Sequence, residues 1–320
     1  MNINLDLLKK LEKVIDPANP EKGLIPIKIL GYGEISLVFE IIGANDNLAY
    51  KKIPIFDTEK QVRRHIWAYK AYNSILLKRI GLLIPESGSA WFKDHKGKIQ
   101  FYCVQEKLDI NSVGNKVIHQ ISDHEVEVLI KLVLNEFKKV WSFNKRNPII
   151  DVGLDGQISN FAVINFNPSN PHIDENTKLL YLDTSTPMIR INGKEAMEAV
   201  LFLKSAPAFL RGILKAAFLK DTVERYYDLR RVIIDLIANF YKEERAELIP
   251  KLIRLANSFL KGELDEFQLA PLTNSEIQKY YKSDAQMWRV FQAVRKLDRF
   301  FQVKLFRKHY DFYLPEKISR

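Results

Sequence analysis

The sequence predicts an α+β protein with two lobes: a small N-terminal lobe built on an antiparallel sheet with one helix, and a larger, mainly helical C-terminal lobe. Three observations lead to this prediction. Runs of β-branched residues separated by turn residues fill the first ~110 positions, and long stretches with apolar residues at helical spacing follow them. The chain has 320 residues, a length that suits two domains or one bilobal unit. We place the boundary at residue 108, which gives lobes of residues 1–108 and 109–320.

The composition is that of a folded chain in a reducing compartment. There are 49 Lys and Arg against 39 Asp and Glu, a formal charge of +10, and 47% apolar residues, which excludes collagenous and largely disordered proteins. The single cysteine, Cys103, excludes a disulfide framework and a thiolate zinc cluster. The N-terminus lacks the features of an export signal, and charged residues interrupt the most apolar stretch, 200–219. We therefore expect a cytoplasmic protein without a membrane span.

Three strands are predicted near the N-terminus. Residues 25–30 lead into Gly31-Tyr32-Gly33, and residues 37–42 form a strand that returns from this turn. A polar turn then leads to the third strand, residues 48–53. This strand ends there because Pro54 cannot donate a hydrogen bond to a neighbouring strand.

A helix and a hairpin complete the predicted N-terminal lobe. Residues 58–77 have apolar side chains at helical spacing, and Gly81 stops this helix. Residues 89–93 and 99–106 are expected to form two strands of a hairpin, because the turn residues at 94–97 separate them.

The C-terminal lobe is predicted to begin with a long core helix opened by Ser122 or Asp123. A short strand pair within residues 149–164, a polar loop and a short apolar run follow it. Beyond Pro187 we expect helices throughout, over residues 195–205, 207–219, 221–245, 247–261 and 274–312, the last with a break near Ser283-Asp284.

A glycine-rich turn joins the first two strands. Gly31 and Gly33 would allow backbone amides to approach an anion closely, as in loops that cover phosphates. Ser36 and Val38 follow in the returning strand. Because a strand and not a helix follows the turn, a dinucleotide-binding fold is disfavoured. A plain hairpin turn is the alternative interpretation.

Two adjacent lysines lie on the third strand. Side chains alternate across a strand, so Ala49 and Lys51 share one face while Tyr50 and Lys52 share the other. Only one of the two lysines can therefore reach a site on a given side of the sheet. Two exposed lysines on a small sheet are the alternative.

Two later segments carry polar residues with a suggestive spacing. Asp155 and Asn160 are five residues apart and precede an apolar strand, and Asp183 follows the apolar run 179–182. Oxygen ligands of this kind suit Mg²⁺. The alternatives are a polar loop in which Asp155 and Asn160 bind turn amides, and a capping role for Asp183.

Taken in order, these segments resemble the protein-kinase-like superfamily, in style closest to its aminoglycoside and choline kinase branch, over residues 25–185. The resemblance implies a bilobal protein-kinase-like fold that binds ATP and Mg between its lobes. It implies that Asp155 faces the acceptor hydroxyl and that Asn160 and Asp183 hold the metal ion. It also implies that the nucleotide contacts Gly31, Gly33, Ser36, Val38, Ala49, Lys51 and, in the hinge between the lobes, Glu106.

The sequence departs from the kinase pattern at several places. Ser36 stands in place of the third glycine, and Gly153 in place of the histidine that usually lies two residues before the aspartate. The glutamate expected midway along the helix after Lys51 is missing. Glu59, at the start of that helix, or Gln61 could hold the lysine instead; the other interpretation of Glu59 is a helix-start acid.

The resemblance implies transfer of the γ-phosphate of ATP to a hydroxyl group. We expect a small-molecule acceptor, because Asp183 is followed by Thr-Ser and not by the Phe-Gly of protein kinases. One alternative is a pseudokinase that binds nucleotide or a partner without turnover.

A second alternative is a basic scaffold that binds nucleic acid or an anionic membrane. The last 33 residues carry nine Lys or Arg against three acids, which is +6 of the total of +10. Apolar residues at helical spacing in this segment also fit a core-packed helix with a solvated basic face, and no recognition motif for nucleic acid is present.

Overall fold

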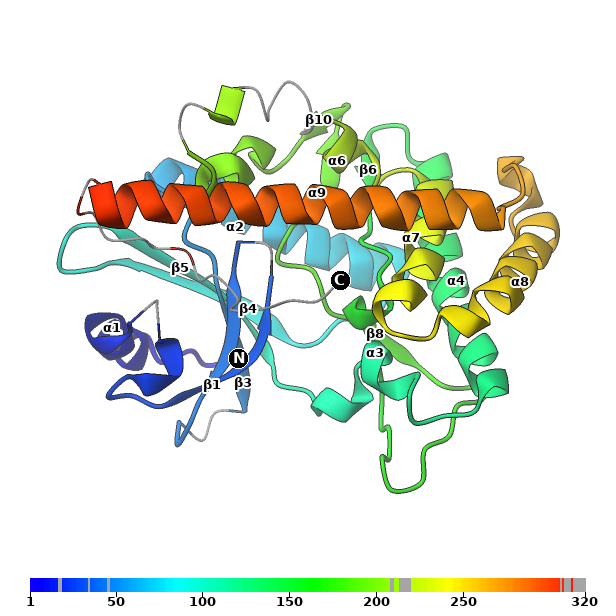
Figure 1. Cartoon of the computed structure of the whole chain (residues 1–320), viewed down its shortest axis with the longest axis horizontal. Helices are drawn as coiled ribbons and strands as arrows, with labels where there is room; N and C mark the ends of the chain where they lie inside the picture. The colour runs from blue at the N-terminus through cyan, green and yellow to red at the C-terminus, as the bar shows by residue number, and fades with distance from the viewer. Residues whose placement is uncertain are drawn as a thin grey trace.

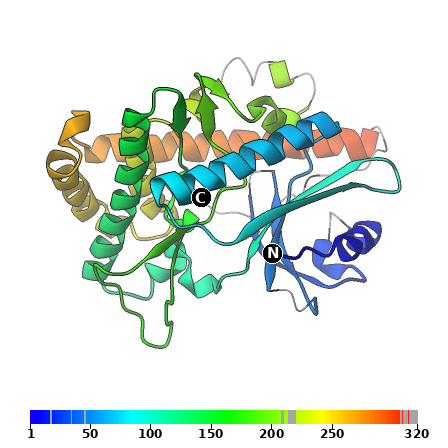
Figure 2. The same ribbon diagram turned by 180° about the vertical axis from the view of Figure 1, so that it is seen from behind.

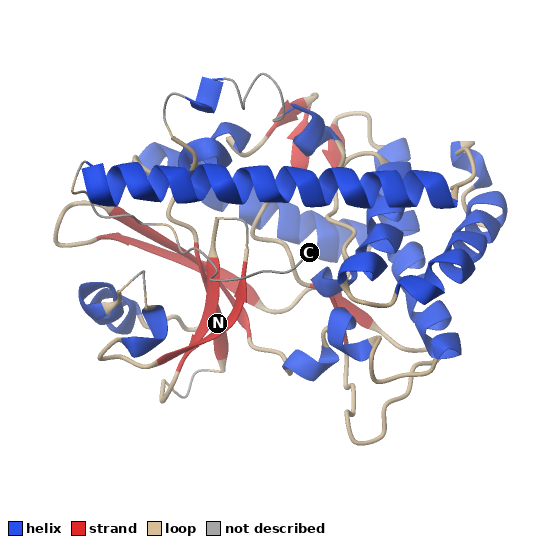
Figure 3. Cartoon of the chain, viewed as in Figure 1, coloured by secondary structure: helices blue, strands red, loops and turns tan. Residues whose placement is uncertain are grey.

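An antiparallel five-stranded sheet forms the N-terminal part of the protein, and helices dominate the remainder (Figure 3). The computed structural model describes residues 1–16, 19–33, 35–44, 47–207, 210–212, 220–305, 307 and 312. The predicted α+β class, with the sheet before the helices, is thus confirmed. The strand order is β1-β2-β3-β5-β4, with β1 at Ile27–Tyr32, β2 at Leu37–Ile41, β3 at Leu48–Lys52, β4 at Ser87–Lys93 and β5 at Ile99–Glu106.

Both faces of the sheet are covered, because its strands alternate between two sets of apolar residues. One face carries Phe39 and Tyr102, which pack with Leu8 of helix α1 (Leu5–Val14). The other face carries Phe101, which packs with Val62 of helix α2 (Glu59–Ile75). Burial of both faces specifies the register, since a slip by one residue would exchange the two sets.

Helix α2 begins and ends near the predicted residues. The Thr58 hydroxyl accepts a hydrogen bond from the Gln61 amide, and the Gln61 side chain accepts one from the Thr58 amide, which together form a capping box. A π-turn over Leu76–Ile80 follows and ends at Gly81, whose φ of +79° is one that glycine adopts without strain. Val62 packs under the sheet, whereas Tyr72 packs in the core of the helical part, so α2 joins the two parts.

The helical part is organised around α4 (Asp123–Arg146), whose capping box at Ser122 confirms the predicted start of this helix. Helices α7 (Leu229–Lys242) and α8 (Ile249–Gly262) pack against α4, and α9 (Asn274–Phe300) packs against α7 (Figures 1 and 2). Two shorter helices are α3 (Gly114–Val117) and α6 (Lys220–Glu224). Among the described residues, no helix is long and apolar enough to cross a bilayer.

The short strands of this part differ from the prediction. The expected strand pair within residues 149–164 does not form: β6 (Ile150–Val152) pairs with β9 (Ile189–Ile191), and β7 (Phe161–Val163) pairs with β8 (Leu179–Tyr181). The strands β9 and β10 (Lys194–Glu195) also lie beyond Pro187, where only helices were expected. Strands of two or three residues are too short to show a period in the sequence, and their partners are distant along the chain.

The predicted helix over residues 207–219 lies largely outside the described residues, at 208–209 and 213–219. The predicted break near Ser283-Asp284 is wrong, because α9 is continuous from Asn274 to Phe300.

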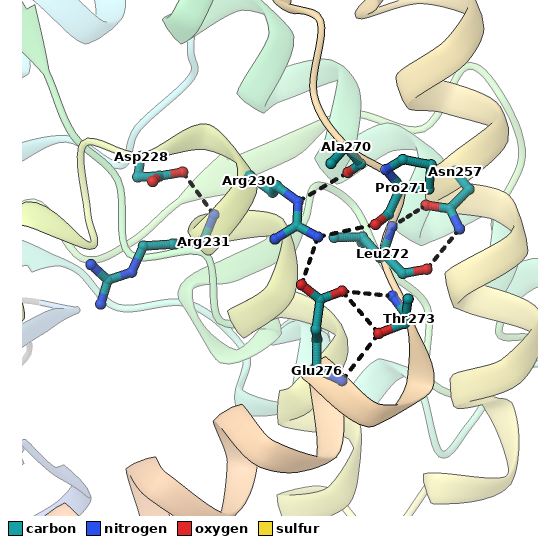
Figure 4. A network of polar contacts seen from close by, with 9 residues as sticks. All are labelled: Asp228, Arg230, Arg231, Asn257, Ala270, Pro271, Leu272, Thr273 and Glu276. Carbon is teal, nitrogen blue, oxygen red and sulfur yellow. Dashed lines mark hydrogen bonds and ion pairs between the residues drawn. The ribbon is translucent and has the colours of Figure 1, made fainter.

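A polar network ties the start of α9 to α7 (Figure 4). Arg230 of α7 donates hydrogen bonds to the carbonyl oxygens of Ala270 and Pro271, at 2.9 and 3.0 Å, and forms a 2.8 Å ion pair with Glu276 of α9. From this anchor α9 runs along the molecule to the N-terminal sheet (Figure 1), where Phe291 packs against the apolar cluster beneath that sheet. The helix therefore contacts both parts of the protein.

Candidate functional site

Lys51 and Asp183, which are 132 residues apart in the chain, form a partly buried ion pair. Lys51 Nζ lies 2.9 Å from Asp183 Oδ1. Burial opposes the charge of Lys51, but the attraction of Asp183 outweighs it, so the pKa of Lys51 is raised. The Ser185 hydroxyl donates a 3.1 Å hydrogen bond to the same carboxylate oxygen. The pair joins strand β3 of the sheet to the segment that follows β8.

The alternation of side chains along β3 decides which lysine reaches this place. Lys52 points to the opposite face of the sheet, where it is buried and lies 2.6 Å from Glu12 of α1. Ala49 lies on the same face of β3 as Lys51, and Val38 is the cross-strand partner of Lys51 on β2. Lys52 therefore has a structural partner in Glu12, whereas Lys51 lies beside Asp183.

The segment from Asp155 to Asn160 lies next to the ion pair. The Asn160 side-chain amide donates to the Asp155 carbonyl at 3.3 Å, and the Leu182 amide donates to the Asn160 carbonyl at 2.8 Å. The Asp155 amide donates to the Tyr181 hydroxyl at 3.1 Å. These bonds join the loop to the strand that carries Asp183, because β7 and β8 pair directly.

Two glycines allow this loop to lie against α7 and the turn before it. A Cβ atom on Gly156 would lie 2.6 Å from the carbonyl oxygen of Val232, and one on Gly153 would lie 2.8 Å from the carbonyl oxygen of Tyr226. Because backbone atoms cannot rotate away, no side chain fits at either position without a shift of the loop. This packing explains why glycine, and not the histidine of the kinase pattern, stands at position 153.

Asp155 sits among other acidic groups in a largely buried position. Burial, then the charge of Asp235 on α7, then that of Asp183 raise the pKa of Asp155 well above its usual value, and Arg225 only partly offsets them. Burial likewise raises the pKa of Asp235, against the attraction of Arg225. At neutral pH these carboxylates therefore hold protons more strongly than exposed ones do.

The expectation that Glu59 or Gln61 holds Lys51 is wrong. Glu59 is half-buried and pairs with Lys93 at 2.8 Å, and the Gln61 side chain is used in the cap of α2. Glu59 is thus a helix-start acid, because its carboxylate lies in the first turn, far from the middle of the helix. The position midway along α2 is taken by His65, whose Nε2 lies 3.1 Å from the Ser185 carbonyl oxygen.

The glycine-rich turn is a closed hairpin. Gly31 pairs with Val38 across the two strands, and the Gly33 amide donates to the Ser36 carbonyl at 3.0 Å. Ser36 is buried. A Cβ atom on Gly33 would lie only 2.3 Å from the Ser36 hydroxyl oxygen. Glu34, at the tip, lies outside the described residues. Glycine at position 33 thus makes room for the serine that replaces the third glycine.

The end of β5 leads from the sheet to the helical part. Glu106 has an exposed side chain, and its amide donates to the Glu86 carbonyl at 2.9 Å. Gln105 points toward the ion pair instead: its side-chain amide donates to the Leu182 carbonyl at 2.9 Å. Gln105 therefore ties the end of β5 to the residue that precedes Asp183.

Asn160 and Asp183 supply oxygen atoms of the kind that Mg²⁺ binds. The Asn160 Nδ2 is engaged with a backbone carbonyl, and no hydrogen bond from the described residues reaches its Oδ1. Lys51 and Ser185 contact one oxygen of Asp183, Oδ1. Among the described residues, no group of three or more His, Cys, Asp or Glu side chains could hold a metal ion. A metal site here would therefore depend on the amide oxygen of Asn160. A metal here would retain several water ligands, as Mg²⁺ usually does.

Several residues of this region carry no signal in the sequence. His65 and Gln105 lie in a helix and a strand with ordinary patterns, and Asp235 stands on the core-facing side of α7. The local clue is a pair of buried polar residues, Asp235 and Asn239, one turn apart on a mainly apolar helix face. The contacts of His65 and Gln105 depend on how distant segments pack.

The four residues Lys51, Asp155, Asn160 and Asp183 lie together, whereas Glu59 and the side chain of Glu106 point elsewhere. Among solved structures, the chain resembles WaaP in complex with acyl carrier protein, at 12% identity and a TM-score of 0.33, over 70% of this chain and 93% of that one. It also resembles the GDP complex of wild-type aminoglycoside 2'-phosphotransferase-IIIa, at 14% identity and a TM-score of 0.32, over 74% of this chain and 92% of that one. No curated protein sequence matches significantly. A family model matches residues 10–299, and the chain therefore belongs to that family, the family of unknown function DUF6206.

Proposed function

We propose that the protein is a kinase-like phosphotransferase that uses ATP and Mg²⁺ to phosphorylate a hydroxyl group of a small molecule. One observation carries the proposal: Lys51 and Asp183 form a 2.9 Å ion pair beside Asp155 and Asn160. A cation, a buried carboxylate and two oxygen ligands in one place are the groups that phosphoryl transfer needs. The lobes would divide near residue 108, after the hinge.

In this proposal the sheet binds the nucleotide. Lys51 would leave Asp183 and bind the phosphates instead. The raised pKa of Lys51 favours this role, because it keeps the side chain positively charged. Val38 and Ala49, on the same face, would contact the base, and the backbone around Glu106 would accept or donate its hydrogen bonds. The hairpin of Gly31, Gly33 and Ser36 would open to cover the phosphates, since the Gly33 amide is engaged with the Ser36 carbonyl in this structure.

Asp155 would orient the acceptor hydroxyl and receive its proton. Its raised pKa favours this role, because a carboxylate that holds a proton strongly is a better proton acceptor than an exposed one. Mg²⁺ bound at Asn160 and Asp183 would neutralise charge on the phosphates. The hydrogen bond from the Asn160 side chain to the Asp155 carbonyl would hold the metal-binding residue at a fixed position relative to the residue that faces the acceptor.

The small-molecule acceptor in this proposal rests on the residues after Asp183, which are Thr-Ser and not Phe-Gly. The cavity lined by Asp235, Asn239, Tyr280 and Asp284, between α7 and α9, measures about 10 Å³ and has room for one water molecule, so it is not the acceptor site.

The proposal is tested by thermal unfolding with ATP, GTP and Mg²⁺, followed by nucleotide hydrolysis assays. Because a ligand bound only by the native state raises stability, ATP with Mg²⁺ should raise Tm by a few degrees, and ATP alone by less. Asp155→Asn should retain this shift and lose hydrolysis, whereas the exposed control Asp265→Asn should retain both.

The alternatives give different results. A shift with ATP and Mg²⁺ but no hydrolysis by the native protein would favour a pseudokinase. The absence of any shift with either nucleotide would contradict the proposal, as would undiminished hydrolysis by Asp155→Asn.

A further inference from the structure

The outer face of the last part of α9 exposes large apolar side chains. Val290, Leu297 and Phe300, with Val303 and Leu305 of the π-turn Phe301–Leu305, are each between 40% and 62% exposed. This segment lies on the outside of the molecule, beyond the part of α9 that packs on α7 (Figure 1). Several large apolar side chains exposed along one helix face of a folded protein are a feature of interaction sites.

The same segment buries its opposite face. Trp288, Arg295 and Asp298 are buried, and Phe291 packs against the cluster beneath the sheet. Because successive residues of a helix are offset by about 100°, these four residues lie on one side of α9 and the exposed apolar residues lie on the other. The packing of this segment on the rest of the protein therefore uses the opposite face and does not involve the exposed apolar residues.

Cations are interleaved with the exposed apolar residues. Arg289, Lys296, Arg299 and Lys304 are exposed, and none of them forms an ion pair with an acid in the described part of the chain. The one acid between positions 289 and 305 is Asp298, which is buried on the opposite side of the helix. The outward face thus carries positive charge without an acidic partner.

This combination restricts what can bind there. A second copy of the same face would bring cations against cations, because the one acid between positions 289 and 305, Asp298, is buried on the opposite side of each helix. Nucleic acid would use the cations but would gain little from Leu297 and Phe300. An interface of anionic lipid head groups and acyl chains uses both sets, the cations at the head groups and the apolar side chains just below them.

We propose that the segment from Arg289 to Leu305 is a docking surface for an anionic lipid bilayer, on which this part of α9 lies in the plane of the interface. The proposal does not depend on phosphotransferase activity, because none of these residues belongs to the region around Lys51 and Asp183. It predicts a protein that binds membranes peripherally.

The test uses the full chain and vesicles of phosphatidylcholine, with and without phosphatidylserine, in a cosedimentation assay. We expect the protein to bind only the vesicles that contain phosphatidylserine. This binding should weaken as the salt concentration rises, because salt screens the charges. Replacing two apolar residues, Leu297→Ser with Phe300→Ser, should weaken binding about tenfold or more. Replacing two cations, Lys296→Gln with Arg299→Gln, should weaken it about fivefold per cation.

Matched control variants change exposed residues elsewhere. Leu24→Ser with Ile149→Ser removes two exposed apolar side chains, and Lys70→Gln with Lys78→Gln removes two exposed cations. Both should bind vesicles as the native protein does, and all variants should keep the native Tm because the changed side chains are exposed.

Three results would overturn the proposal. The first is absence of binding to phosphatidylserine vesicles, and the second is equal loss of binding in the control variants. The third is self-association in solution that Leu297→Ser with Phe300→Ser disperses, which would make the face an interface between copies. Hydrolysis of ATP in solution is unaffected by any of these outcomes, so the two proposals fail separately.

Discussion

Among single residues, Lys51 shows how the environment sets the state of a charged group. Burial alone would favour the neutral amine, yet the attraction of Asp183 at 2.9 Å keeps it charged and raises its pKa. His65, in the adjoining part of α2, shows the opposite balance. Its ring packs against both Phe56 and Phe101, and burial lowers the pKa of His65 to about 4, against the hydrogen bond to Ser185.

A double-mutant cycle should measure the ion pair. Lys51→Met and Asp183→Asn should each destabilise the protein by about 1–2 kcal/mol, because each leaves a partly buried partner without its contact. The double variant should lose less than the sum of the two, with a coupling of about 1 kcal/mol in urea unfolding. Additive losses would show that the two side chains do not interact in solution.

The stability of the protein should fall in acid because of His65. The folded state keeps His65 neutral down to about pH 4, whereas the unfolded chain binds a proton below about pH 6.5, so the unfolded state gains protons between these values. This linkage removes up to about 3 kcal/mol as the pH falls through that window. Relative to the native protein, His65→Gln should be less sensitive to pH between 6.5 and 4 in urea unfolding. Parallel pH profiles of the two proteins would contradict the assignment.

Among the elements, the loop from Asp155 to Asn160 depends on close packing against α7. Gly156 and Gly153 allow the backbone to approach Val232 and Tyr226, and β7 and β8 then hold the loop beside Asp183. The spacing of Asp155 and Asn160 is thus one condition for the arrangement, and the absence of side chains at the two glycines is another.

Gly156→Ala should destabilise the protein by about 1–3 kcal/mol, because a methyl group would overlap a backbone oxygen that cannot rotate away. Gly262→Ala, at the end of α8, is the matched control, since no atom lies within 4 Å of its Cβ. This control should be neutral or slightly stabilising. Equal Tm values for the two variants would rule out the close approach of the loop to α7.

Across the whole molecule, several contacts join the sheet to the helical part. Gln105 binds the carbonyl of Leu182, and Arg64 of α2 donates to the carbonyl of Ala196 at 2.7 Å. Helices α2 and α9 each pack in both parts, α9 through Phe291 on the sheet side. We therefore expect the two parts to unfold together.

Cooperative unfolding can be measured with two variants that each retain a single tryptophan. Trp91 lies on β4 in the sheet, and Trp141 lies on α4 in the helical core. Their fluorescence transitions in urea should coincide, because the shared helices cannot remain packed on one part alone. Two separate midpoints would show that the parts are independent domains.

Local patterns in the sequence were sufficient for the order of sheet and helices, the five strands of the sheet, the approximate ends of α2 and the cap that opens α4. These features depend on turn residues and on the spacing of apolar side chains within one segment. Only the tertiary structure decided that Lys51 meets Asp183 and not Glu59, that β6 pairs with β9, and that the outer face of α9 stays exposed. Each of these depends on packing between segments that are far apart in the chain, and a local period contains no information about such partners.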